Sequence, residues 1–554
     1  SAGRTSALEY FRSGNDSPGR GSTNPAAIGH MSYTSQWWEF EGVPGLYMRL
    51  KERADLLLKV QARLQVLQQR HLRLEWSQSG LQLKFISVSG DQPYYANTEA
   101  SGLIQLIPLL AAIYDDEISI LLVDEPEVSL HPQLQAFLLE ELQSVAGRPT
   151  DDAKKKVVVI ATHSASMVPL KQALDISNIV FFRDRKSLPI QVATDAGELK
   201  SRKLGALTSR LSENHKFAFF ALSILLVEGP SDEIFMVGLS QALKHPLLMA
   251  NTQIVPIIGK GEFVETIKFF RLMGKRVCIM ADLDALTDDN AVVVSFRSEA
   301  ADFIEQAGHN DLASFDQSLR SELSKLVNDD WESIHSTAES HRYWKNRNVT
   351  DDIAKRRAAL AALLSTCEKT IHSYKESQRW LKLRKRYIAL LEILDRTGCV
   401  FLRKGTIEDY FSETLAPIPK PEAAAIEVER LMTYEESQII SMYSDPVRSL
   451  RGAAPIPEIN ENYLLREQLG SLLGAALQIV AADMPDDELN ARVAANSSTD
   501  QPLFRFENKT EVKNGSAVRR IKVSINSPAF FRSNFPFEIS EGDNQAIAIR
   551  AQLP

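Results

Sequence analysis

Three apolar segments of this chain end abruptly in acidic residues, and this pattern limits the possible folds more than any other feature. Residues 118–123, 223–227 and 277–281 are almost wholly apolar, and each is followed at once by a carboxylate. An apolar run of this length is typical of a buried strand, and a strand that ends in an acid brings charge to the edge of a sheet. We therefore predict an α/β protein with two acidic sites. The carboxylates are Asp124 and Glu125 in the first site, and Glu228, Asp232, Asp282 and Asp284 in the second.

The composition is that of an ordinary globular protein. Of 554 residues, 44% are hydrophobic and 24% are charged, and a chain of this length predicts about three to four domains. The apolar run 103–113 is too short to cross a bilayer, so we expect no membrane partner. Three cysteines without metal-ligand spacing favour a reducing, cytoplasmic location, and we interpret Cys367 and Cys399 as buried apolar residues. The net charge of −8 argues against a protein that simply coats nucleic acid, but not against an enzyme that acts on it.

Predicted strands and helices alternate along most of the chain. This alternation is typical of a largely parallel sheet that helices cover on both faces. Residues 290–395 are predicted to be almost wholly helical, sheet-like sequence resumes at 398–402, and helices continue over 421–493. The last fifty residues, which include 521–525 and 546–549, are predicted to be rich in strands. The expected strands are 118–124, 156–161, 223–228, 253–258 and 276–282, and the expected helices are 46–72, 99–115, 132–146, 231–243 and 262–273.

The first acidic site lies within a series of short motifs. Residues 124–126 read Asp-Glu-Pro, residues 130–132 read Leu-His-Pro, and the next predicted strand is followed by Thr-His-Ser at 162–164. One carboxylate can hold Mg²⁺ while a second orients an attacking water, as nucleotide hydrolysis requires. The series resembles the ABC-type ATPases, in the branch shared with SMC-like and RecF-like repair proteins. The resemblance implies ATP as a cofactor, with Asp124 as metal ligand, Glu125 as catalytic carboxylate and His163 as switch. A core strand with a polar end is the alternative interpretation.

A phosphate-binding loop of the form G-x-x-x-x-G-K-[ST] does not occur in these 554 residues. The nearest sequence, residues 14–22, lacks the lysine and follows no convincing strand. We expect the true loop to lie upstream of this sequence, and we expect the polypeptide alone to hydrolyse ATP weakly or not at all.

The second acidic site has a different composition. Glu228 closes one predicted strand, and Asp232 lies one helical turn further on. Asp282 and Asp284 are two residues apart, so in an extended segment their side chains would share a face. Four carboxylates that meet at one sheet edge suit Mg²⁺ or Mn²⁺, because these hard cations prefer oxygen ligands, whereas zinc prefers histidine and cysteine. Acids at strand ends without any metal are the alternative interpretation.

This site resembles the Toprim domain, and in particular that of the OLD (overcoming lysogenization defect) nucleases and the related Gabija-type defence nucleases. Residues 226–232 are similar to the first acidic motif of the OLD family, residues 281–284 to its paired aspartates, and residues 258–261 to a glycine-lysine turn. Residues 402–410 look like its further metal-site glutamate element, which implies a role for Glu408. The resemblance covers about 95–425 and implies two metal ions that flank the scissile phosphate. It also implies an assisting basic residue, for which Lys260, Lys404 and Lys420 are candidates.

The resemblance implies an order of domains. Residues 1–200 are expected to form an ABC-type ATPase domain without its P-loop, 215–290 a Rossmann-like Toprim core, and 291–397 a helical insertion. Residues 398–495 would complete the Toprim and add helices, and 496–554 would form a strand-rich tail. Two interpretations of the basic and aromatic run 379–387 stay open, namely a nucleic-acid contact or a solvated helix with Trp380 in the core. The basic run 355–357 is interpreted as surface.

Together these features predict a Mg²⁺- or Mn²⁺-dependent endonuclease that cuts DNA under the control of an ATPase domain, in defence against phage. The family implies a homodimer or larger assembly and leaves room for a second defence protein as partner. The alternative hypothesis is a nucleotide-sensing scaffold whose partner activates a Toprim effector, with tRNA as a target. The sequence alone does not separate DNA from RNA, because phosphodiester chemistry at a metal site is alike in both.

Overall fold

The computed structural model divides the chain into two compact units, residues 1–456 and 457–554. Both units are mixed α/β structures, and apolar cores lie within each of them. No helix among the described residues combines the length and apolar character that crossing a membrane requires. The structure describes residues 27–28, 43–77, 80–90, 92–150, 154–183, 185–211, 213–257, 259–306, 308, 311–345, 347, 350–412, 418–455, 461–495, 503–513, 516–527 and 530–553.

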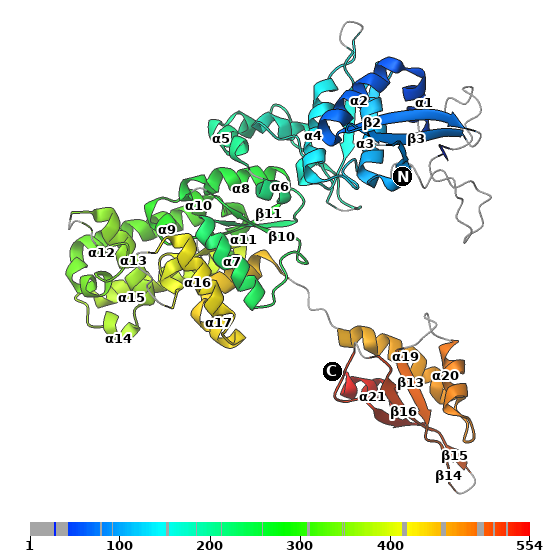
Figure 1. Cartoon of the computed structure of the whole chain (residues 1–554). Helices are drawn as coiled ribbons and strands as arrows, with labels where there is room; N and C mark the ends of the chain where they lie inside the picture. The colour runs from blue at the N-terminus through cyan, green and yellow to red at the C-terminus, as the bar shows by residue number, and fades with distance from the viewer. Residues whose placement is uncertain are drawn as a thin grey trace. The chain divides into compact units, whose positions relative to one another are not determined.

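The N-terminal part of the first unit is built on an antiparallel hairpin with helices packed against it. Its elements are β1 (Ala27–Ile28), α1 (Val43–Glu52), α2 (Ala54–Gln68), β2 (Arg70–Ser77), β3 (Gly80–Ser87), β4 (Tyr94–Tyr95) and α3 (Ser101–Tyr114). Strands β2 and β3 pair along their whole length, and Figure 1 shows α2 and α3 beside them. The predicted helix over 46–72 is divided in two because Arg53 is extended between α1 and α2. Leu56, Val60 and Leu64 recur every four residues and enter the core.

A pair of parallel strands carries the first acidic motif. Strand β5 (Ile120–Asp124) pairs with β6 (Val157–Ala161), and α4 (Pro132–Val145) runs between them in sequence. Parallel sheets are usually covered on both faces, yet the side chains of Ile120 and Leu122 are 62% and 72% exposed. Among the described residues, one face of this pair is therefore open, which differs from the predicted two-sided cover.

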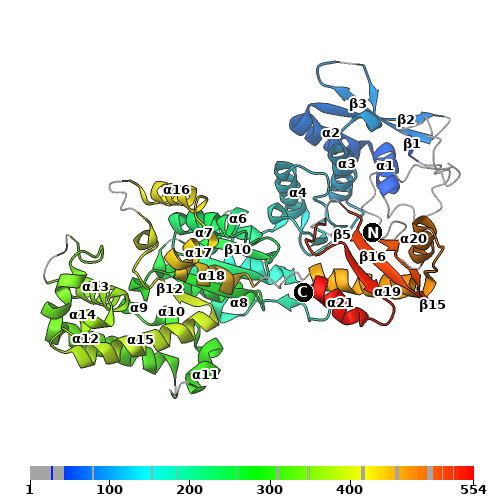
Figure 2. The same cartoon turned by 90° about the horizontal axis from the view of Figure 1, so that it is seen from below.

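The second parallel sheet is covered on both faces, as predicted. Its strands are β9 (Ser223–Val227), β10 (Thr252–Pro256), β11 (Arg276–Ala281) and β12 (Cys399–Phe401), in the spatial order β10-β9-β11-β12. Alternate residues of β9 enter different cores. Ile224 and Leu226 face the core that includes α8 (Phe263–Leu272), while Leu225 and Val227 face the core that includes α7 (Pro230–Ala242). Figure 2 shows helices on both sides of this sheet. Between β6 and β9 the chain also forms β7 (Val180–Phe181), β8 (Ile190–Gln191), α5 (Arg202–Arg210) and α6 (Glu213–Phe217).

The long segment between β11 and β12 is helical. It comprises α9 (Asp284–Asp288), α10 (Ala291–Val294), α11 (Arg297–Gln306), α12 (Leu312–Ala338), α13 (Asp352–Ser365), α14 (Glu368–Ile371) and α15 (Ser377–Thr397). Helices α12, α13 and α15 contact one another and lie together in Figure 1. After α15, strand β12 pairs in parallel with β11, so the insertion leaves and re-enters the same sheet. Cys399 is buried in this sheet, but Cys367 is exposed, so the prediction that Cys367 is buried was wrong.

The sheet is followed by helices that close the first unit. These are α16 (Lys420–Leu431), α17 (Glu436–Met442) and α18 (Ser444–Ala453). Helix α16 packs along α7, and α18 packs against β9 and β11. This packing places Lys420, the first residue of α16, close to the carboxyl end of the sheet, where the acids of the second site lie.

The C-terminal unit combines helices with an antiparallel sheet. Its elements are α19 (Glu461–Ile479), α20 (Asp486–Ala494), β13 (Phe504–Asn508), β14 (Glu511–Lys513), β15 (Ser516–Val518), β16 (Arg520–Ile525), β17 (Phe537–Ser540) and α21 (Gln545–Gln552). Leu469 and Leu473 of α19 share a core with Phe506 and Val523 of the sheet. Helices α19 and α20 therefore belong to this unit, and the predicted boundary at 495 lies too late in the chain.

One predicted strand of this unit is a helix. Residues 546–549 alternate Ala and Ile, which resembles the period of a strand, but they lie within α21. The side chain of Asn544 accepts a hydrogen bond from the Ile547 N–H and caps the helix. Ile549 and Leu553, four residues apart, then enter the same core.

Candidate metal and nucleotide sites

Strand β9 and the turn into α7 place the first two acids of the second site. Glu228 follows the last residue of β9, and Pro230 starts α7 in the position where its missing N–H costs no hydrogen bond. The Gly229 N–H donates to Oδ2 of Asp232 at 2.9 Å, which caps the helix and fixes the Asp232 carboxylate. Asp232 is only 6% exposed, so this turn delivers a buried charge beside Glu228.

Strand β11 supplies the paired aspartates. Asp282 follows the strand, and Asp284 is the first residue of α9. The prediction that both lie on one face of an extended segment was wrong, because Leu283 between them is helical, with φ −62° and ψ −23°. The turn nevertheless gathers the acids. One ligand oxygen each from Glu228, Asp282 and Asp284 lies within 4.8 Å of the others.

Burial and mutual repulsion disfavour the charged forms of these acids. Burial, together with the charges of Glu408 and Glu228, raises the pKa of Asp232 to about 7. Burial, and then the Asp284 charge, raises the pKa of Glu228, and burial with the neighbouring acids raises the pKa of Asp282 well above its usual range. Among the described residues, Oε2 of Glu228 and Oδ1 of Asp284 are buried without a hydrogen-bond partner. Buried carboxylates with free oxygens suit a divalent cation that prefers oxygen ligands.

The raised pKa of Asp232 predicts a pH-dependent metal effect. Between about pH 4 and pH 7 the folded state binds the Asp232 proton and the unfolded state does not, so the metal-free protein loses stability as pH rises through this window. The positive charge of a cation bound beside Asp232 favours the ionised form of its carboxyl group, whose fraction rises about tenfold from pH 6 to pH 8 for a pKa of about 7. We expect Mn²⁺ to raise the melting temperature of EDTA-treated protein more at pH 8 than at pH 6. Equal shifts at both pH values would contradict this prediction.

Glu408 approaches the same region from the far end of the insertion. It lies in the 3₁₀ turn Ile407–Tyr410, and its Oε2 accepts from the Thr406 hydroxyl at 2.7 Å. Burial opposes ionisation of Glu408, but the Thr406 hydrogen bond and the Lys420 charge outweigh it and lower the pKa. Asp232 and Glu408 lie outside the cluster that Glu228, Asp282 and Asp284 form. The Glu408 charge nevertheless contributes to the raised pKa of Asp232 and of Asp282.

Gly405 allows the Glu408 segment to approach β11. Its φ is +128°, and its carbonyl accepts from the Leu283 N–H at 2.8 Å. A Cβ at this position would lie 2.5 Å from Oδ2 of Asp409 and 2.8 Å from the His341 ring. We expect Gly405→Ala to lower the free energy of unfolding by about 1–3 kcal/mol, as for a side chain forced into a sparsely populated conformation.

Urea unfolding measures this loss, and Gly452→Ala is the matched control. Gly452 lies in α18, and nothing lies within 4 Å of the position its Cβ would take. Alanine favours a helix over glycine, so the control should not lose stability. A Gly405→Ala protein as stable as the unmodified one would contradict the prediction.

The three candidate lysines have different environments. Nζ of Lys260 lies 2.7 Å from Oδ2 of Asp284 and 2.5 Å from Oδ2 of Asp288. Nζ of Lys420 lies 3.0 Å from Oε1 of Glu408, and its side chain is 62% exposed. The structure does not bring Lys404 to the acids. Its Nζ lies over the Tyr410 ring, 4.5 Å from the centroid, and donates to the Met442 carbonyl.

The helical insertion contributes residues to this site that the sequence did not indicate. Arg342 pairs with Glu408, the Tyr343 hydroxyl bonds to the Asp284 N–H, and Arg357 pairs with Asp288. The run 355–357 was interpreted as surface, and for Arg357 that interpretation was wrong. No local signal marks these residues, because their partners lie more than fifty positions away in sequence. Asp288 is the exception, because its position four residues, or about one helical turn, after Asp284 could have indicated a further acid near the cluster.

At the first site the parallel pairing of β5 and β6 brings the predicted residues together. The Glu125 N–H donates to the Ala161 carbonyl, so Glu125 and His163 follow paired strand ends. Nε2 of His163 lies 4.0 Å from Oε1 of Glu125, and the ring is 84% exposed. Asp124 is the exposed last residue of β5. Glu127, which sequence reasoning missed, accepts from the His163 N–H at 2.7 Å. The P-loop candidate 14–22 lies outside the described residues.

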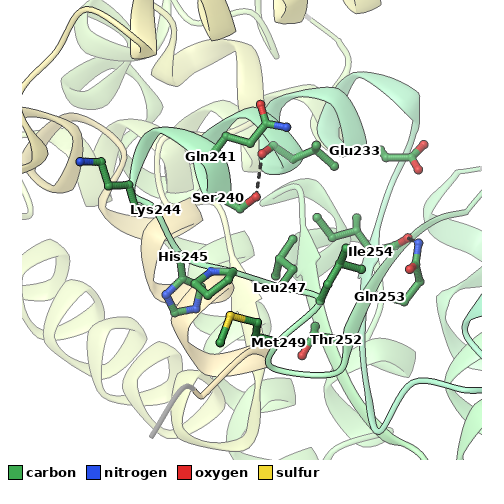
Figure 3. A pocket seen from close by; sticks show the side chains of 13 residues that line it. Glu233, Ser240, Gln241, Lys244, His245, Leu247, Met249, Thr252, Gln253 and Ile254 are labelled. Carbon is green, nitrogen blue, oxygen red and sulfur yellow. Dashed lines mark hydrogen bonds between the residues drawn. The ribbon is translucent and has the colours of Figure 1, made fainter. Parts of the chain in front are cut away.

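A separate pocket of about 630 Å³ lies between α7 and the edge strand β10. Figure 3 shows Lys244, His245 and Met249 among its lining residues. The Ser240 hydroxyl donates to the Val237 carbonyl at 2.7 Å. None of the predicted metal or nucleotide residues lines this pocket. We therefore do not assign it to either site.

Comparisons with known proteins agree with the two sites. Residues 16–168 match the family described as "AAA domain, putative AbiEii toxin, Type IV TA system". Residues 219–284 match the family described as "Overcoming lysogenization defect protein-like, TOPRIM domain". The chain is 25% identical over 158 residues to Endonuclease GajA of Bacillus cereus (strain VD045), a stretch that covers 27% of this chain and only 25% of that relative. An AAA ATPase domain followed by an OLD-like Toprim domain is thus the architecture of this chain, and it matches that of the OLD-family ATPase–Toprim nucleases.

Proposed function

We propose that this chain is a Mg²⁺- or Mn²⁺-dependent endonuclease that cuts DNA at the acidic edge of its Toprim sheet, with the ATPase domain as regulator. The observation that carries the proposal is the approach of Glu228, Asp282 and Asp284 within 4.8 Å, with buried oxygens free to take ligands. The similarity to an endonuclease over part of the chain supports the reaction class. By the resemblance to OLD and Gabija-type nucleases, we assign the activity to defence against foreign DNA.

The charges around the acids explain why a cation would be required. A phosphodiester is negatively charged, and a cluster of carboxylates repels it unless positive charge is added. Glu228, Asp282 and Asp284 would hold the ion, with Asp232 and Glu408 beside them. A bound Mg²⁺ or Mn²⁺ would polarise the phosphate and lower the pKa of a bound water.

The chain's own lysines supply further positive charge. Lys420 is 62% exposed at its contact with Glu408, so its ammonium can reach a phosphate that approaches from solvent. Lys260 is 31% exposed and is held between Asp284 and Asp288. We therefore assign contact with the scissile phosphate to Lys420, and the balancing of charge on Asp284 to Lys260.

Cleavage of supercoiled plasmid with Mg²⁺ and with Mn²⁺ tests the proposal. We expect nicked and linear products that disappear with EDTA, and a slower reaction for Lys420→Ala. If plasmid stays intact while tRNA is cut under the same conditions, the target class in the proposal is wrong. If neither is cut, with ATP present or absent, the proposed nuclease function is contradicted.

A further inference from the structure

Arg342, from the turn between α12 and α13 of the insertion, contacts two neighbouring carboxylates. Its Nη1 donates to Oε2 of Glu408 at 3.0 Å, and its Nε donates to Oδ1 of Asp409 at 2.8 Å. The Glu408 side chain is 7% exposed, so its charge is poorly screened by solvent. The planar fork of an arginine can serve both carboxylates at once, whereas a lysine is a single point of charge. Arg342 therefore fixes the direction of Glu408 as well as balancing its charge.

Tyr343, the next residue, joins the two ends of the metal site. Its hydroxyl donates to the Gly405 carbonyl at 3.1 Å and accepts from the Asp284 N–H at 3.2 Å. The side chain is buried, at 9% exposure. The ring of the preceding His341 also bonds to the Lys404 carbonyl at 2.8 Å. One short turn thus contacts the segment that carries Asp284 and the segment that carries Glu408, which lie more than a hundred residues apart in sequence.

We propose that this turn, residues 341–343, is a clamp that holds the Asp284 and Glu408 segments at the spacing the metal site needs, with Arg342 and Tyr343 as positioning residues. The proposal rests on the metal-dependent function proposed above. It gives the helical insertion a role in that site, since the contacts come from within the insertion. Apart from Arg342, the described polar contacts of the Glu408 carboxylate are Thr406 and the exposed Lys420.

Metal affinity is the property that the clamp should control. Partners that orient a metal ligand without touching the metal typically contribute about 10–100-fold in affinity. We therefore expect Arg342→Ala to weaken Mn²⁺ binding by about tenfold or more. Arg342→Lys should recover part of the loss, because a lysine keeps the positive charge but lacks the planar fork that sets the directions of both hydrogen bonds. Tyr343→Phe keeps the ring and loses the hydroxyl, so it should also weaken binding.

Calorimetric titration of the full chain with Mn²⁺, without nucleic acid, tests the clamp independently of catalysis. Arg297→Ala is the matched control. Arg297 lies in the same insertion and pairs with Asp311 at 2.6 Å. Its loss should leave Mn²⁺ affinity unchanged. Melting temperatures in EDTA identify variants that fail to fold. If Arg342→Ala fails to fold, the Mn²⁺ affinity of Tyr343→Phe, which removes a single oxygen, tests the clamp.

The outcomes separate the clamp from the function on which it rests. If the unmodified chain binds no Mn²⁺, the proposed metal-dependent function fails and the clamp fails with it. If the unmodified chain binds Mn²⁺ and folded Arg342→Ala and Tyr343→Phe bind equally well, the clamp alone is overturned. A loss of the same size in Arg297→Ala would also overturn it, because the effect would then be a general one of insertion stability.

Discussion

Glu228→Gln is expected to lower the rate of DNA cleavage by more than about 100-fold, the upper end of what residues that merely orient a metal ligand contribute. Glutamine keeps the shape of the side chain and removes the charge that would hold a cation. The same change should leave the metal-free protein as stable or more stable. Burial and the Asp284 charge raise the Glu228 pKa, which means that the folded state disfavours the ionised form. Loss of activity with no loss of stability separates a functional carboxylate from a structural one.

Two measurements check this expectation. Plasmid cleavage is followed over time with Mn²⁺, and melting temperatures are compared in EDTA at pH 8. Asp302→Asn is the control, because Asp302 is exposed on α11 and should affect neither quantity. A Glu228→Gln protein that cuts at the rate of the control would place the chemistry elsewhere in the chain.

The sequence was sufficient to find the main acids because their positions depend on local pattern. Apolar runs form the buried parallel strands β9 and β11, and the carboxyl ends of parallel neighbours meet at one edge. Glu228 and Asp282 follow these two strands, so their proximity could be predicted without knowing how the rest of the chain packs. The pairing of β5 with β6 brought Glu125 and His163 together for the same reason.

Long-range contacts could not be predicted in this way. The partners of Arg342 depend on where the insertion folds back against the sheet, and nothing near position 342 in sequence indicates that. Lys404 was a plausible assisting residue by its place near Glu408, but the chain turns its ammonium onto the Tyr410 ring. Residues 546–549 were predicted as a strand because four alternating residues fit the period of a strand as well as that of a helix. In the structure they lie in α21, which begins after the N-cap Asn544.

The basic and aromatic run 379–387 shows how burial resolves alternatives that the sequence leaves open. Trp380 and Tyr387 are fully buried in α15, while Lys382 and Lys385 are exposed. The two aromatic rings are therefore unavailable for stacking on bases. The alternative with Trp380 in the core is correct, and any nucleic-acid contact of this run would involve only its exposed cations and phosphates.

The burial of Trp380 in α15 predicts a large effect on stability instead of catalysis. Trp380→Ala should lower the free energy of unfolding by about 3–5 kcal/mol, the usual cost of truncating a buried aromatic residue. Trp380→Phe keeps most of the buried volume and loses the 3.0 Å hydrogen bond from the indole N–H to Oδ2 of Asp330, so it should cost less, about 1 kcal/mol.

Urea unfolding and DNA binding of the same variants separate the two roles of this run. If Trp380 acts only in the core, folded Trp380→Phe should bind DNA as the unmodified chain does, and Lys382→Ala should leave stability unchanged. If instead Trp380→Ala unfolds at the same urea concentration as the unmodified chain and binds DNA more weakly, the side chain acts at a nucleic-acid surface and the packing of α15 is wrong. Because the insertion also carries Arg342 and Tyr343, a severe loss of stability in Trp380→Ala should weaken Mn²⁺ binding as a secondary effect.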